Sequence, residues 1–146
     1  MVVYRKTNLG CKNMKILTFG SKIESQDIAM KLDRITGNAN VYINTFDIEE
    51  FPKIILFEKP DMIIVTADGA YGKDCVNIAK EINNKTPLFW FSNDVSCAEL
   101  ADTLSCTCFA KKPVFSKTLY VAMQSILAVK STGNIAGRVP YAKMVS

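Results

Sequence analysis

Histidine is absent from this chain of 146 residues. Without it the chain cannot build a His-based catalytic triad, a His metal ligand or a phosphohistidine relay. Its five cysteines form no CxxC pair, so a zinc site made of four thiolates is not predicted. We expect buried thiols of a reducing compartment at these positions, which are Cys11, Cys75, Cys97, Cys106 and Cys108.

Long apolar runs are also missing. No run approaches the roughly 20 residues needed to span a bilayer. The basic residues at the N-terminus are not followed by an apolar stretch, so they do not form a secretory signal. We therefore predict a cytoplasmic protein with no membrane association.

The excess of positive charge lies at the two ends of the chain. Residues 1–13 carry three basic residues and residues 131–146 carry two, and neither segment contains an acid. Without these five charges, residues 14–130 hold 13 basic and 14 acidic residues. This segment lacks the electrostatic footprint of a nucleic-acid binder, so we predict no direct binding to nucleic acid and solvated tails.

Between the tails, short apolar runs alternate with helical patterns. We predict strands at 16–19, 41–46, 62–65, 88–91 and 107–110, and helices at 24–36, 50–58, 73–83, 96–104 and from 116 onward. Ser96 and Glu99 match a capping box, Ser116 is predicted to cap the last helix, and Pro52 is tolerable in a first turn. The expected organisation is an extension at 1–13, one domain at 14–130 and a linker at 131–146. The sequence leaves open whether residues 1–13 are native.

This alternation predicts one α/β fold. Strands joined by right-handed helical crossovers form a parallel sheet that is covered on both faces. We expect a doubly wound, flavodoxin-like sheet of five strands in the order 2-1-3-4-5. Its functional crevice should lie at the carboxyl ends of the first and third strands, where the winding reverses.

Several short motifs lie at the starts and ends of the predicted strands. Pro60-Asp61 precedes the third strand, Thr86-Pro87 precedes the fourth, Ser92 ends it, and Lys112-Pro113 follows the fifth. With these motifs, residues 14–130 resemble the receiver domain of bacterial response regulators, the CheY-like family. The resemblance implies phosphorylation of an aspartate at the end of the third strand, with Mg²⁺ held by an acidic pair after the first.

This sequence retains only one half of that family pattern. Lys112 matches the lysine that pairs with the phosphoryl oxygens, Ser92 the switch hydroxyl and Phe109 the switch aromatic. The acceptor position, however, falls on Thr66.

The acidic pair falls on Gly20 and Ser21, which offer no carboxylate for a metal ion. We therefore predict a degenerate receiver that binds no metal or cofactor, is not phosphorylated and is not an enzyme. Asp68 is predicted to lie too far along the loop to replace the acceptor. Lys112 is predicted to lack an acidic partner.

The expected role is that of a protein-interaction module. The resemblance implies homodimerisation or docking of a partner through the face of the fourth helix, fifth strand and fifth helix. Candidate residues on this face are Cys97, Leu104, Phe115, Leu119, Tyr120 and Met123. The chain either stands alone or forms the N-terminal regulatory part of a transcriptional response regulator.

One alternative belongs to a different class. A flavodoxin-like domain could bind a small ligand, or an anion held by Lys112, Ser92 and Thr66 with help from Lys22 and Lys111. The sequence contains no GxGxxG phosphate-binding fingerprint to support a nucleotide ligand.

Overall fold

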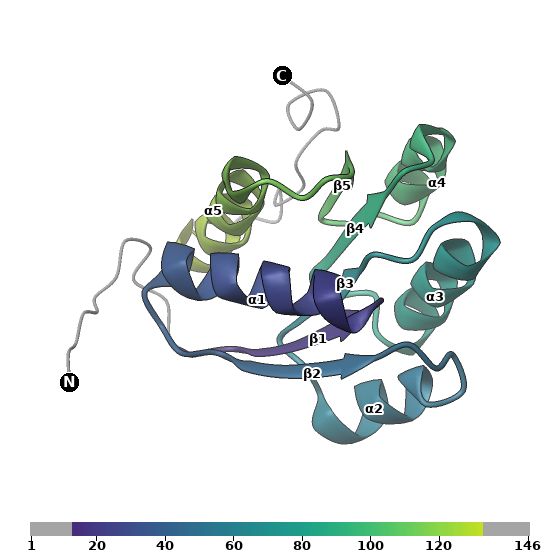
Figure 1. The fold of residues 1–146 in the computed structure, drawn as a ribbon, viewed down its shortest axis with the longest axis horizontal. Helices are drawn as coiled ribbons and strands as arrows, with labels where there is room; N and C mark the ends of the chain where they lie inside the picture. The colour runs from purple at the N-terminus through teal and green to yellow at the C-terminus, as the bar shows by residue number, and fades with distance from the viewer. Residues whose placement is uncertain (1–12, 133–146) are drawn as a thin grey trace.

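A computed structural model describes residues 13–132, in which β-strands alternate with α-helices (Figure 1). The strands are β1 (Lys15–Phe19), β2 (Val41–Thr45), β3 (Met62–Val65), β4 (Leu88–Ser92) and β5 (Cys108–Lys111). The helices are α1 (Lys22–Thr36), α2 (Phe51–Glu58), α3 (Gly69–Ile82), α4 (Ala98–Thr103) and α5 (Ser116–Thr132), with a 3₁₀ turn η1 (Val95–Cys97) before α4.

The strands form one parallel sheet in the order β2-β1-β3-β4-β5, which confirms the predicted topology. Helices α1 and α5 cover one face of the sheet, and α2 and α3 cover the other (Figure 1). All pairs are parallel, so the carboxyl ends of β1, β3, β4 and β5 meet at one edge.

The central strands explain the two-sided core. All four residues of β3 are buried, with Met62 and Ile64 facing the α1–α5 side and Ile63 and Val65 facing the α2–α3 side. Strand β4 repeats this pattern, because successive side chains of a strand point to opposite faces. A continuous apolar run therefore corresponds to a strand buried on both faces, as predicted.

Helix α3 begins four residues earlier than predicted. Asp68 is at its N-cap position, and Gly69 follows with a φ of 62°, a conformation that glycine adopts without a Cβ clash. Gly72 packs so closely that a Cβ there would collide with the Ala67 carbonyl oxygen. These two glycines interrupt the apolar pattern, so the pattern placed the start of α3 too late in the sequence.

The predicted caps at Ser96 and Ser116 are wrong. The carboxylate of Asp94 accepts hydrogen bonds from the Ser96 amide at 3.0 Å and the Ser96 hydroxyl at 2.6 Å. Asp94 therefore initiates η1, and α4 continues from that turn without a side-chain cap. Ser116 is the first residue of α5, which extends to Thr132, two residues beyond the predicted domain end.

The cysteines of the described segment are buried, as predicted. Cys75, Cys97, Cys106 and Cys108 lie in the core and form no disulfide. Burial, with a smaller contribution from the nearby Asp74 charge, raises the pKa of the Cys75 thiol to about 12. Cys11 lies outside the described residues. Within residues 13–132 no helix is both long enough and apolar enough to cross a membrane.

Candidate functional site

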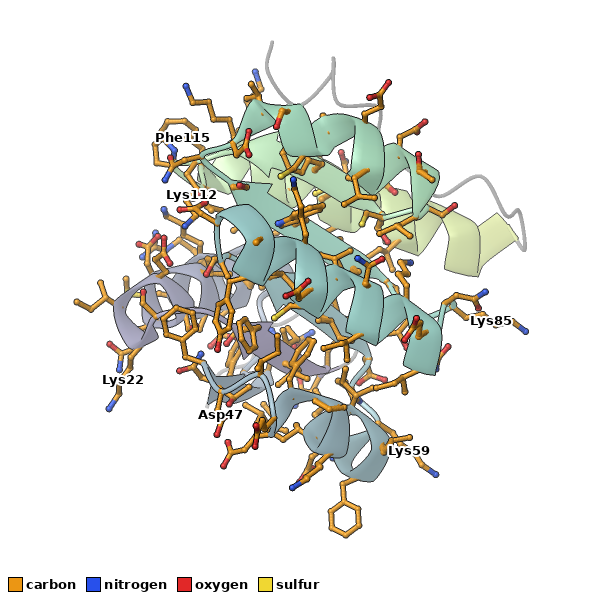
Figure 2. The ribbon with its side chains drawn as sticks, turned by 90° about the vertical axis from the view of Figure 1, so that its right-hand side faces the viewer. Lys22, Asp47, Lys59, Lys85, Lys112 and Phe115 are labelled. Carbon is orange, nitrogen blue, oxygen red and sulfur yellow. The ribbon has the colours of Figure 1, made fainter. Side chains whose placement is uncertain are left out.

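The four loops at the carboxyl edge of the sheet bring the predicted pocket residues together. Thr66 follows Val65, which pairs with Phe19 of β1, and the Thr66 amide donates to the Phe19 carbonyl at 2.9 Å. On the other side, the Lys112 amide donates to the Ser92 carbonyl at 3.2 Å. In Figure 2 this edge lies at the left, where Lys112 is labelled.

Lys112 is held by two carboxylates, so the prediction that it lacks an acidic partner is wrong. Its Nζ lies 2.8 Å from Glu24 Oε2 and 3.5 Å from Asp68 Oδ2, and its side chain is only 12% exposed. A single ammonium thus faces two carboxylates, which gives this group a net negative charge. This balance disfavours the anion site considered from sequence, because an anion would have to displace a carboxylate that is already bound.

Glu24 is the pocket residue that sequence reasoning missed. It lies in the first turn of α1, where the Ser21 hydroxyl caps the helix by accepting from the Glu24 amide at 3.2 Å. Glu24 Oε1 then accepts from the Ser21 hydroxyl at 3.2 Å and from the Thr66 hydroxyl at 3.1 Å. The spacing of Ser21 and Glu24 is that of a capping box, and this signal could have identified both the helix start and the inward carboxylate.

Asp68 lies two residues past the acceptor position at Thr66, at the N-cap position of α3, and its carboxylate faces the pocket. Its Oδ1 accepts from the Ser92 hydroxyl at 3.2 Å and from the Asn93 amide at 2.8 Å, and its Oδ2 accepts from the Asn93 side chain at 3.1 Å. Asp68 therefore links the start of α3 to the loop after β4.

These contacts also set the ionisation of Asp68. Desolvation alone would raise its pKa. The hydrogen bond from the Asn93 amide and the charge of Lys112, with the side chains of Asn93 and Ser92, outweigh that effect, so the pKa of Asp68 lies below its ordinary value. The carboxylate is ionised wherever the pH is near neutral.

Thr66 and Gly20 form a closely packed floor. Thr66 is 1% exposed, and its hydroxyl donates to Glu24 rather than facing solvent. A Cβ added at Gly20 would collide with Thr66 Oγ1. Glycine is therefore sterically required beside threonine in this packing, and a carboxylate at position 20 would need a different neighbour.

The residues that match the family switch are both buried. Ser92 is fully buried and Phe109 is 3% exposed. The Phe109 ring packs edge-on against Trp90, with ring centroids 5.4 Å apart and an interplanar angle of 84°. Phe109 therefore occupies an inward position under the loop that carries Ser92.

The pocket does not fit the Mg²⁺ ion of receiver domains. The acidic-pair positions hold Gly20 and Ser21, and both nearby carboxylates already contact the ammonium of Lys112. Among the described residues, no group of three or more His, Cys, Asp or Glu side chains could hold a metal ion. Lys22 and Lys111 are exposed, and Figure 2 shows Lys22 pointing away from Lys112.

A groove of about 510 Å³ opens beside the pocket, between α1 and the segment that follows β5. Its apolar wall includes Ile23 and Val114, and its charged residues include Lys112 and Glu24. The volume falls within the range of small-molecule sites.

The proposed docking face is only partly exposed. Leu119 and Met123 have no exposed surface and belong to the core under α5, and Cys97 is equally buried on the other side. Leu119 and Met123 share a helical stripe with the buried residues Ala122 and Ile126, and this stripe of α5 faces the sheet. Phe115 and Tyr120 are 59% and 37% exposed, respectively.

Leu104, the remaining candidate, is half-buried against the core on the α2–α3 side. Three of the six candidate face residues are therefore core residues, and the exposed part of the face rests on Phe115 and Tyr120.

Comparison with known proteins supports the fold. No protein-family model matches the sequence, and no curated protein does. Among solved structures, a response regulator receiver domain protein from Clostridium thermocellum matches at 20% identity and a TM-score of 0.68, over 82% of this chain and 98% of that one.

Two other structures give the same result. A LuxR-family two-component response regulator from Aurantimonas sp. SI85-9A1 matches at 18% identity and a TM-score of 0.66, over 80% of this chain and 86% of that one. The receiver domain of the Francisella response regulator 1452 matches at 19% identity and a TM-score of 0.61, over 82% of this chain and all of that one. The chain therefore has the fold of the response regulator receiver domains.

Proposed function

We propose that this chain is a receiver-like signalling module of the cytoplasm that acts through protein–protein contacts and is not switched by phosphorylation. The observation that carries the proposal is the pairing of Lys112 with Glu24 and Asp68. In the family that the sequence resembles, this lysine pairs with the incoming phosphoryl group. Here the chain's own carboxylates occupy it.

The acceptor position supports the same conclusion. Thr66 is buried, and its hydroxyl is bonded to Glu24. With 1% of its surface exposed, Thr66 does not present its hydroxyl to a phosphoryl donor in solution. The neighbouring positions 20 and 21 supply no carboxylate ligand for Mg²⁺.

Asp68 has the contacts expected of a built-in substitute for the phosphoryl group. It accepts from the Ser92 hydroxyl and lies within ion-pair distance of Lys112, the two side chains that the family resemblance assigns to phosphoryl binding. Phe109 is buried beneath them. We infer that Asp68 holds the loop after β4 in one arrangement and that the output face does not depend on a phosphoryl donor.

Output would then occur by docking at the face of α4, β5 and α5. Phe115 and Tyr120 are its exposed aromatic residues, and aromatic side chains are enriched in protein interfaces. The partner is a second copy of this chain or another protein. Whether the chain regulates an attached output domain stays a prediction.

Phosphorylation can be tested directly. The full chain is incubated with acetyl phosphate and Mg²⁺, with an established receiver domain as the positive control, and the intact mass is measured. We expect the positive control to gain one phosphoryl group and this chain to gain none. A stoichiometric adduct that is lost in the Asp68→Asn or the Thr66→Ala variant would overturn the proposal.

A second candidate function is favoured by the groove beside α1. Its volume of about 510 Å³ suits a small ligand of the kind that flavodoxin-like domains bind. Native mass spectrometry of the purified chain discriminates the two candidates, since a ligand that copurifies at one equivalent would favour the binding domain.

A further inference from the structure

Two exposed aromatic rings lie side by side at the carboxyl edge of the sheet, away from the pocket. Phe46, directly after β2, is 54% exposed, and Tyr71, in the first turn of α3, is 38% exposed. Their ring centroids are 5.6 Å apart at an interplanar angle of 68°. The Tyr71 hydroxyl donates to the Phe46 carbonyl at 2.9 Å, which ties the two elements together.

The core holds this aromatic pair in place. The buried ring of Phe19 lies 5.6 Å from the Phe46 ring and 5.3 Å from the Tyr71 ring, centroid to centroid. A surface aromatic pair that packs on a buried ring loses little side-chain entropy when a partner binds, because its rotamers are already restricted.

Carboxylates flank the pair. Asp47 follows Phe46, Glu49 lies in the same turn, and Asp74 lies one helical turn beyond Tyr71; all three are exposed. Residues 44–52 contain no lysine or arginine. Within residues 13–132 none of these three carboxylates forms an ion pair, and Figure 2 shows Asp47 on the rim apart from Lys112.

We propose that this aromatic-acidic patch, formed by Phe46, Asp47, Glu49, Tyr71 and Asp74, binds a segment of a partner protein that presents an arginine or lysine beside an apolar side chain. A cation over an aromatic face is attracted by the ring quadrupole. The flanking carboxylates attract the same cation and disfavour an acidic segment. The neighbouring apolar side chain of the segment would cover the exposed edge of the rings.

A second exposed phenylalanine, Phe57, lies outside the aromatic-acidic patch and separates the effect of the patch from the effect of exposure alone. Phe57 on α2 is 88% exposed, more than Phe46. Its exposed neighbours include two basic residues, Lys53 on the same helix and Lys59 at the C-cap, and the adjacent carboxylate of Glu58 is paired with Lys15 at 3.1 Å. A single exposed apolar residue needs no partner to explain it. Phe57 therefore provides the matched control for Phe46.

The test uses the full chain and two synthetic peptides. One peptide alternates leucine with arginine over eight residues, and the other has the uncharged citrulline in place of each arginine. Amide chemical shifts are followed by NMR at low salt. We expect the arginine peptide to shift signals of residues 45–49 and 70–75, and the citrulline peptide to bind at least tenfold more weakly.

The variants locate the site. Phe46→Ser and the double variant Asp47→Asn/Glu49→Gln should each weaken the arginine peptide roughly fivefold, whereas Phe57→Ser should leave its affinity unchanged. The double variant replaces only exposed side chains, so it keeps the test valid if Phe46→Ser fails to fold.

Equal affinity for the two peptides, shifts centred elsewhere, or an equal loss in Phe57→Ser would each overturn the proposal. None of these outcomes bears on the phosphorylation test, because the patch shares no residue with the pocket of Lys112.

Discussion

At the scale of single residues, the pocket is defined by side chains that bond to one another. Glu24 bonds to Lys112, Thr66 and Ser21, and Asp68 bonds to Ser92 and Asn93 and lies near Lys112. No single one of these partly exposed contacts contributes much free energy, since an exposed ion pair is worth about 0–1 kcal/mol. Together they occupy the donors that a phosphoryl group would require.

The packing of Gly20 against Thr66 leads to a prediction about stability. Gly20→Ala adds a Cβ where Thr66 Oγ1 lies, and we expect a loss of roughly 1–3 kcal/mol in the free energy of unfolding, from overpacking. In the Thr66→Ala background the loss should be smaller, because the colliding oxygen is gone. Denaturant unfolding of the four proteins in this cycle measures the coupling.

Gly69 supplies the control for that cycle. A Cβ at Gly69 meets no atom within 4 Å, but the φ of 62° makes any L-residue strained there. Gly69→Ala should therefore be destabilising to the same extent in both backgrounds. If Thr66→Ala relieves Gly69→Ala as much as it relieves Gly20→Ala, the steric explanation for Gly20 is wrong.

At the scale of elements, Asp68 connects the start of α3 with the loop between β4 and η1. The connection uses one carboxylate, two donors from Asn93 and the hydroxyl of Ser92. Ser92 also accepts from the Asp94 amide at 3.0 Å, so the loop is bonded on both sides of its hydroxyl. This links the position of η1 and α4 to the ionisation state of Asp68.

The lowered pKa of Asp68 gives a pH dependence with a definite sign. Its folded-state pKa lies below the unfolded value of about 3.9, so its contribution to stability is complete above that value and is lost as the pH falls through the folded-state pKa. The difference in unfolding free energy between the wild type and Asp68→Asn should be constant near neutral pH and shrink below about pH 4. Urea unfolding at several pH values measures it.

Lys112→Met tests whether the charge of Lys112 contributes to the lowered pKa of Asp68. Without the ammonium, the same Asp68→Asn substitution should produce a smaller change with pH, because one of the groups that favours the carboxylate has been removed. A wild-type difference that instead grows as the pH falls would contradict the assigned direction.

At the scale of the whole molecule, two helical layers enclose one sheet (Figure 1). The pocket, the aromatic-acidic patch and the groove all lie near the carboxyl edge. The exposed aromatic residues of the α4–β5–α5 face lie around α5, so a partner docked there would leave the patch accessible.

Association through that face is testable by sedimentation. If the chain forms homodimers there, its average mass should rise with concentration. Tyr120→Asp should then raise the dissociation constant at least tenfold, since the loss of a hot-spot aromatic side chain costs about 2 kcal/mol or more and tenfold corresponds to about 1.4 kcal/mol. Phe57→Asp on α2 is the control and should leave association unchanged. A wild type that stays monomeric at high concentration rules out the homodimer and leaves docking of another protein.

Run length was sufficient to predict the buried central strands, and the alternation of strands and helices with right-handed crossovers favoured the doubly wound sheet and the position of its crevice. The absence of carboxylates at Gly20, Ser21 and Thr66 is read directly from the sequence, and the correspondence of these positions to a receiver pocket rests on the family resemblance. Which carboxylates replace them was decided by tertiary structure. Glu24 and Asp68 lie 44 residues apart in the sequence, at the starts of two different helices, and meet only because parallel strands end together at one edge of the sheet.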